Sequence, residues 1–178
     1  MRIIAGSRKG HRLVAPKGRD TRPTGDRVRE AAFNLIGPVD GASVLDLFAG
    51  SGAMGLEALS RGAERAVFVE SDRDAVRAIE ANLDKLGLRA AVSRSDVVRA
   101  LAGEAAAGRR YDLVLVDPPY RMLPDLMPRL QRHLAAVLAP DGVLVLESDA
   151  RDEPELEGLA VRTSRRYGSA RLTLFEHQ

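Results

Sequence analysis

Cysteine is absent from this chain of 178 residues, and aromatic residues make up only 4% of it. Without cysteine there is no disulfide, no thiolate metal ligand and no cysteine nucleophile. Methylation at carbon 5 of a pyrimidine, which generally needs a thiolate, is therefore disfavoured. No stretch approaches the ~20 apolar residues of a membrane span, and the first residues do not read as a signal peptide. We expect a cytoplasmic protein with no membrane partner.

Metal-binding patterns are also missing. The three histidines, His11, His133 and His177, lie far apart and lack the spacing of metal ligands. The hydrophobic fraction of 45% and the charged fraction of 29% are typical of one globular domain. No long apolar edge demands a partner chain, so we expect a monomer without a metal.

Positive charge is concentrated at the start of the chain. Residues 1–30 hold nine Lys and Arg against three acids, whereas the remaining 148 residues hold 18 basic and 22 acidic side chains. This asymmetry predicts a polyanionic partner, with an ordinary Arg-rich surface as the alternative. We expect residues 1–20 to form a basic arm for RNA and residues 21–178 the main domain. The candidate RNA contacts are Arg2, Arg8, Lys9, Arg12, Arg22 and Arg27.

The hydrophobic pattern predicts an α/β fold. Extended stretches at 2–5 and 11–15 predict a basic N-terminal β-hairpin, and a helix capped by Thr24 or Asp26 follows, with Val28, Ala32, Leu35 and Ile36 on its apolar side. Strands and helices then alternate, which predicts a Rossmann-like, doubly wound and mostly parallel sheet of seven strands. The expected strands are 44–48, 65–69, 90–93, 111–116 and 143–147, with helices at 53–60, 72–86, 96–106 and 124–138. Two final stretches, 160–167 and 170–176, predict a C-terminal antiparallel hairpin.

A glycine-rich loop follows the first of these strands. Gly50, Gly52 and Gly55 match the dinucleotide fingerprint, so NAD is one interpretation. Asp46, however, lies four residues before the first glycine, where an anion opposes a pyrophosphate and suits a cation. S-adenosylmethionine has a sulfonium and an α-amino group for Asp46, and its carboxylate can face the loop amides.

Two more acids follow the next two strands. Glu70 can accept both ribose hydroxyls, a device that NAD enzymes share, or it can simply be a solvated strand end. Asp96 can bind the adenine amine, cap its own helix, or do both. Together with the glycine loop, these positions favour S-adenosylmethionine, for which the expected contacts are Asp46, Phe48, Gly50, Ser51, Gly52, Glu70, Ser71, Asp96, Val97 and Asp117.

The motif Asp117-Pro118-Pro119-Tyr120 ends the apolar run 111–116. Asp117 and the Pro118 carbonyl can accept hydrogen bonds from an exocyclic amine, and the Tyr120 ring can stack on a base. Since ligands of open α/β sheets bind at the carboxyl ends of strands, the motif predicts a pocket for a nucleobase amine. A plain strand-ending turn is the alternative.

Taken together, the chain resembles the S-adenosylmethionine-dependent amino-methyltransferases, and more narrowly the bacterial small-subunit ribosomal RNA guanine-N2 methyltransferases. The resemblance rests on Asp46–Gly62, Glu70, Asp96 and Asp117–Tyr120, on Arg22-Pro23-Thr24 with Arg27–Glu30, and on both chain ends. It implies methylation of N2 of guanine 966 of 16S rRNA in an assembling 30S particle, with Asp117, Pro118 and Tyr120 catalytic. Gly25 and Met54 depart from the family pattern without touching this chemistry.

Other functions share parts of the pattern. DNA adenine-N6 and cytosine-N4 methyltransferases use the same tetrapeptide but usually add a recognition domain, and protein glutamine methyltransferases typically begin the motif with Asn. A small NAD-binding module accounts for the glycines alone. A non-catalytic RNA-binding assembly factor accounts for the basic arm alone.

Overall fold

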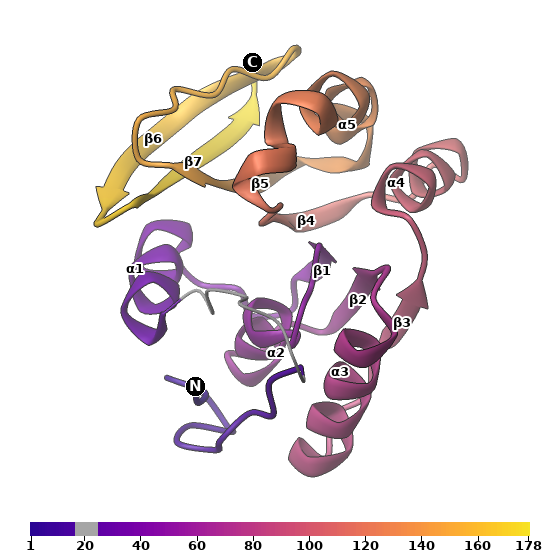
Figure 1. Cartoon of the computed structure of the whole chain (residues 1–178), viewed down its shortest axis with the longest axis vertical. Coiled ribbons are helices and arrows are strands. Elements are labelled where there is room, and N and C mark those ends of the chain that lie inside the picture. Colours follow the sequence, from indigo (N-terminus) through magenta and orange to yellow (C-terminus); the bar gives the residue numbers. More distant parts are fainter. Residues whose placement is uncertain (17–24) are drawn as a thin grey trace.

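The sheet has seven strands in the order β3-β2-β1-β4-β5-β7-β6. The computed structural model describes residues 1–16 and 25–178, and Figure 1 shows helices on both faces of the sheet. Strands β1 to β5 run parallel, whereas β7 is antiparallel to both β5 and β6. The predicted fold class is confirmed, including the C-terminal hairpin. The strands are β1 Ser43–Leu47, β2 Arg65–Glu70, β3 Ala91–Arg94, β4 Tyr111–Val116, β5 Leu138–Asp149, β6 Leu159–Tyr167 and β7 Ala170–His177.

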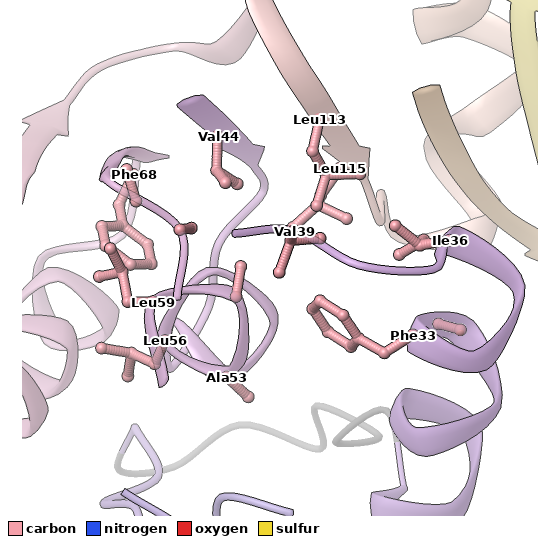
Figure 2. Close-up of a cluster of buried hydrophobic side chains, with 14 of the residues drawn as sticks. Phe33, Ile36, Val39, Val44, Ala53, Leu56, Leu59, Phe68, Leu113 and Leu115 are labelled. Atoms are coloured by element: carbon pink, nitrogen blue, oxygen red, sulfur yellow. The ribbon is translucent and has the colours of Figure 1, made fainter. Parts of the chain in front are cut away.

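Two apolar clusters lie on the two faces of this sheet. The first packs α1, α2 and α3 on one face, and Figure 2 shows Phe33 of α1 directed toward Val39 and Leu115. The second packs α4 and α5 on the other face. The helices are α1 Asp26–Ile36, α2 Ala53–Ser60, α3 Arg73–Leu86, α4 Val97–Ala106 and α5 Leu123–Val137, with a short 3-10 turn η1 at Tyr120–Met122.

Two local predictions were wrong. Asp26 does not cap α1, because Gly25 occupies the cap position and Asp26 is the first helical residue, paired with Arg29 at 3.0 Å. Strand β5 begins at Leu138 rather than residue 143, because residues 139–142 form an irregularity between the pairs Tyr111↔Leu138 and Leu113↔Val143. Residues 139–142, which include Pro140, therefore interrupt the register without ending the strand.

The buried face of α1 is wider than predicted. Ala32 and Ile36 are buried as expected, and Val28 and Leu35 are partly buried against the same apolar cluster, but Phe33 and Arg29 are buried as well. A fully buried arginine is costly unless its charge is compensated. Asp26 supplies part of the compensation, and the buried part comes from Glu57 of α2, whose Oε2 lies 3.5 Å from Arg29 Nε, with both of these side chains 0% exposed.

Residues 1–13 form a short hairpin that packs on α2. One antiparallel bridge pairs Arg2 with Arg12, and Ile3 is only 1% exposed. The backbone amides of Ile4 and Ala5 donate to the two carboxylate oxygens of Glu57 at 2.9 and 3.0 Å. Arg29 donates to the carbonyl of Arg2. A single buried carboxylate therefore joins the hairpin, α1 and α2.

We predict that Glu57→Ala lowers the free energy of unfolding by about 3–5 kcal/mol, because it removes the buried partner of Arg29 and leaves only the partly exposed Asp26 beside that charge. Urea denaturation measures this loss. Asp74→Ala is the control, since Asp74 and its partner Arg77 are both mostly exposed and such pairs contribute up to about 1 kcal/mol. Equal losses in the two variants would contradict the assigned role of Glu57.

Candidate active site

Three acids meet at the carboxyl ends of three adjoining strands. Asp46 lies on β1, Glu70 ends β2, and Asp117 directly follows β4. Strand β1 is paired with both β2 and β4, so these ends are neighbours in the sheet. Burial raises the pKa of Asp46, and the carboxylates of Asp117 and Glu70 raise it further, so both lie close enough to interact with Asp46.

Asp46 is held behind the glycine loop. Its side chain is 3% exposed, and Oδ2 accepts a hydrogen bond from the Gly55 amide at 2.9 Å. Burial is the main cause that raises its pKa well above the usual value, and this hydrogen bond only partly offsets it. Because like charges add to the effect, a cation bound nearby would relieve the electrostatic cost of ionising Asp46.

Glu70 holds the other side of the same loop. Its Oε2 accepts from the Gly50 amide at 2.9 Å, and its Oε1 accepts from the Asp72 amide at 2.8 Å. Each carboxylate oxygen has a second lone pair, so Glu70 retains the capacity to accept ribose hydroxyls. Two of the loop amides, those of Gly50 and Gly55, thus donate to the two acids.

The backbone of the loop explains two of its glycines. Gly52 has φ of 80° and caps α2 in the left-handed region, which favours glycine. A Cβ at Gly55 would lie 2.4 Å from the ring of Phe68, so this position excludes every other residue. Phe48 adopts φ of 59° without being glycine. Such backbone strain clusters at functional sites.

The remaining predicted cofactor contacts lie on the same edge of the sheet. Asp96 follows β3 and caps α4, with its side chain accepting from the Arg99 amide at 3.0 Å. The cap is therefore formed, and a role toward adenine stays a prediction. Ser71 is exposed beyond Glu70, whereas the side chain of Val97 is buried in the second apolar cluster.

The tetrapeptide after β4 is oriented by a residue that the sequence analysis missed. Pro118 is buried, and Tyr120 begins η1 with its hydroxyl donating to Glu147 Oε1 at 2.8 Å. Val116 of β4 is paired with Leu146 of β5 in parallel register, so the next residues of the two strands, Asp117 and Glu147, are neighbours along the sheet. An acid at the end of an apolar strand is the signal that could have identified Glu147, as it identified Glu70.

An open depression of about 630 Å³ adjoins Tyr120. Its walls come from η1, from the start of α5 and from residues 149–155. The depression therefore borders the tetrapeptide at Tyr120, and no residue of the glycine loop lines it. Within the part of the chain that the structure describes, no group of His, Asp and Glu side chains could hold a metal ion. Among the same residues, no helix is long and apolar enough to cross a membrane.

The candidate RNA contacts differ in their surroundings. Arg2, Lys9 and Arg12 of the hairpin are exposed, as is Arg27 on α1. Arg8 is partly buried, and its Nε donates to the Leu86 carbonyl at 2.6 Å, at the end of α3. Arg8 therefore has a structural role as well. Arg22 and the candidate cap Thr24 lie outside the described residues.

We predict that Asp46→Asn raises the melting temperature at neutral pH. Burial makes ionisation of the Asp46 carboxylate unfavourable, and the substitution removes that carboxylate. Since folding raises this pKa, the penalty develops as pH rises above the unfolded value of about 3.9. The gain should therefore shrink as pH falls toward that value. Calorimetry between pH 5 and 8 measures the difference in melting temperature between variant and wild type, which amounts to about 2–4 °C per kcal/mol of added stability. A variant less stable than the wild type at every pH would contradict this account.

Comparisons with known proteins show the family of the chain. Residues 1–176 match the family model described as Conserved hypothetical protein 95. The chain is 42% identical over 183 residues to YlbH of Bacillus subtilis (strain 168), named provisionally as an rRNA methyltransferase, covering 99% of this chain and 98% of that protein. It is 39% identical over 155 residues to ribosomal RNA small subunit methyltransferase D of Escherichia coli (strain K12), covering 85% and 76% of the two chains.

Solved structures show the same fold. The Escherichia coli protein yhhF, named provisionally as a methyltransferase, superimposes with a TM-score of 0.85 at 34% identity, covering 100% of this chain and 98% of that one. SMU.776, solved in complex with SAH, has a TM-score of 0.70 at 15% identity, covering 84% and 48%, and shows the fold alone. The chain therefore belongs to the family described as Conserved hypothetical protein 95, alongside the ribosomal RNA small subunit methyltransferases.

Proposed function

We propose that this chain transfers a methyl group from S-adenosylmethionine to the exocyclic N2 of a guanine in 16S rRNA, guanine 966 in the conventional numbering. The observation that carries the proposal is the cluster of Asp46, Glu70 and Asp117 beside the glycine loop. The relative named as a small-subunit rRNA methyltransferase supports the substrate class. In this proposal the protein acts as a cytoplasmic monomer on an assembling 30S particle.

The acid cluster discriminates between the two cofactors that the glycine pattern allows. S-adenosylmethionine supplies an activated methyl group on a sulfonium and carries an α-ammonium, so it brings positive charge. The pyrophosphate of NAD would bring two negative charges toward three carboxylates. Burial strengthens this preference, because Asp46 is only 3% exposed and the low dielectric enlarges each interaction. The residues of the site therefore fit the cation.

The tetrapeptide would position the base. A carboxylate at Asp117 and a carbonyl at Pro118 accept hydrogen bonds from the amine and favour a more tetrahedral nitrogen with an available lone pair. Stacking on Tyr120 would contribute about 1–3 kcal/mol. The hydrogen bond from Tyr120 to Glu147 restrains the ring, so less side-chain entropy is lost when a base binds.

Proton removal needs no strong base in this proposal. The nitrogen becomes acidic once it is methylated, and Asp117 then accepts the proton or passes it to water. Positioning would supply much of the rate enhancement. A stacked guanine must leave its helix to reach the pocket, and a loop guanine would cost less to extract.

The hairpin would dock on the RNA backbone through Arg2, Lys9 and Arg12. Phosphate contacts orient an RNA without reading its sequence. The rest of the chain forms the catalytic fold, so we propose that target choice depends on the folded shape of the ribosomal particle. Short naked RNA should then be a poor substrate.

We predict that Asp117→Ala lowers turnover on 30S particles from cells lacking this modification by at least about 100-fold. Labelled S-adenosylmethionine measures the transfer, and mapping of the modified base identifies its site. Asp125→Ala, an exposed acid at the start of α5, is the control. Label in DNA, protein or short RNA in place of 30S would overturn the substrate. No transfer to any acceptor, despite binding of S-adenosylhomocysteine, would favour a non-catalytic assembly factor.

We also predict that the triple variant Arg2→Gln, Lys9→Gln, Arg12→Gln weakens 30S binding and flattens its salt dependence. Each lost phosphate contact should reduce the slope of log K against log salt by about 0.7–0.9. A matched triple variant at Arg162, Arg165 and Arg166 removes exposed charge from edge strand β6, far from the hairpin in Figure 1. Similar slopes for the two triple variants would mean that the arginine-rich surface acts as a whole.

A further inference from the structure

Asn82 of α3 connects two segments that the proposed function uses separately. Its side chain is 0% exposed, and Oδ1 accepts from the Val14 amide at 2.7 Å. Its Nδ2 donates to the Val14 carbonyl and to the Ser51 carbonyl, both at 3.0 Å. Val14 directly follows the N-terminal hairpin, and Ser51 lies in the glycine loop. One amide group therefore bridges the two.

On the loop side, Asn82 fixes the orientation of a peptide group. The carbonyl of Ser51 accepts from Asn82, and the amide of the same peptide, on Gly52, donates to the Ala49 carbonyl at 2.7 Å. Position 52 is also closely packed, because a Cβ there would lie 3.3 Å from Ile79 of α3 and from Phe68. The central peptide of the loop is thus held on both its edges against the face of α3 that carries Asn82.

On the hairpin side, the contact is made by the backbone. The side chain of Val14 is 44% exposed, so apolar packing of this residue does not account for its position. Its backbone amide and carbonyl both bind Asn82, while the preceding Leu13 amide donates to the Met1 carbonyl across the hairpin. A shift of the hairpin would therefore be transmitted to Asn82 and from there to the Ser51 carbonyl.

We propose that Asn82 is a positioning residue that couples RNA binding at the hairpin to cofactor binding at the glycine loop. The inference rests on the proposed function, because it takes the hairpin as an RNA contact and the loop as the cofactor site. RNA that restrains Val14 also restrains the loop peptide, and the cofactor then binds a loop that is already ordered. By linkage, the cofactor increases RNA affinity by the same factor.

The experiment measures S-adenosylhomocysteine affinity by equilibrium dialysis with and without unmodified 30S particles. Wild-type protein should bind the compound at least about fivefold more tightly in the presence of 30S, at the lower end of typical coupling. Asn82→Ala should abolish most of this enhancement. Asn82→Asp retains an acceptor for the Val14 amide but loses both donated hydrogen bonds, so it should act similarly if Asn82→Ala folds poorly.

Ser60→Ala is the matched control. Ser60 Oγ donates to the Ala5 carbonyl at 2.6 Å and accepts from the Arg8 amide at 2.9 Å, so its loss loosens the hairpin while Asn82 stays in place. The control should keep the 30S-dependent enhancement. Hydrogen exchange gives a second readout: 30S should protect the glycine loop amides in the wild type and in Ser60→Ala, but not in the Asn82 variants.

The outcomes separate this inference from the proposed function. Wild-type protein that methylates 30S, with equal enhancement in the wild type and both Asn82 variants, would overturn the coupling role alone. Methylation without any enhancement in the wild type would do the same. Equal loss of the enhancement in Ser60→Ala and in the Asn82 variants would overturn the coupling role, because Asn82 would then only stabilise the hairpin as Ser60 does. Failure of the wild type to bind or methylate 30S would overturn both.

Discussion

The burial of the Asp46 carboxylate, together with repulsion from the Asp117 and Glu70 carboxylates at the neighbouring strand ends, is the constraint on which the rest of the site depends. Strand β1 lies between β2 and β4, so the pairing of the strands, and not the conformation of the loops, brings Asp46, Glu70 and Asp117 together. The glycine loop offsets part of this repulsion by donating its Gly55 amide to Asp46 and its Gly50 amide to Glu70. The loop can pass this close only because Gly55 has no side chain, since a Cβ there would lie 2.4 Å from the Phe68 ring and 2.9 Å from Asp46 Oδ2. The glycine spacing therefore reflects the acids as much as a ligand.

The N-terminal residues belong to the folded body as well as to the proposed RNA surface. Glu57 accepts the Ile4 and Ala5 amides, Ser60 bonds Ala5 and Arg8, and Asn82 holds Val14. These contacts use the backbone, which leaves the side chains of Arg2, Lys9 and Arg12 exposed. A surface attached in this way presents charge from a fixed position, which lowers the entropy cost of binding a structured partner. Arg8 is the exception, because its guanidinium donates to the Leu86 carbonyl at the end of α3.

Local pattern was enough to predict most of the elements and the acids of the site, because alternating strands and helices bring strand-end residues to one edge. The sequence could not predict partners that are distant in the chain. Charged residues are almost never fully buried unless they are paired, and Arg29 and Glu57 are both fully buried as such a pair. Asn82 carried no signal, because its two partner residues lie 31 and 68 residues away. Glu147 was also missed, although its strand-end position, which matches that of Glu70, was a usable signal.

Two buried acids eleven residues apart show how a carboxylate whose charge the fold compensates differs from one that we propose binds a ligand. Glu57 lies among donors, with Arg29 and Arg61 against its oxygens and two backbone amides beside them. Its negative charge is compensated within the fold, so removing it costs stability. Asp46 is almost as deeply buried, but the charged groups that shift its pKa are both carboxylates, and they raise it further. A fold that retains such an acid gives up stability at neutral pH, and binding a cation recovers it. The charge imbalance at Asp46, more than the glycine pattern, therefore distinguishes this site from a binding site for an anionic dinucleotide.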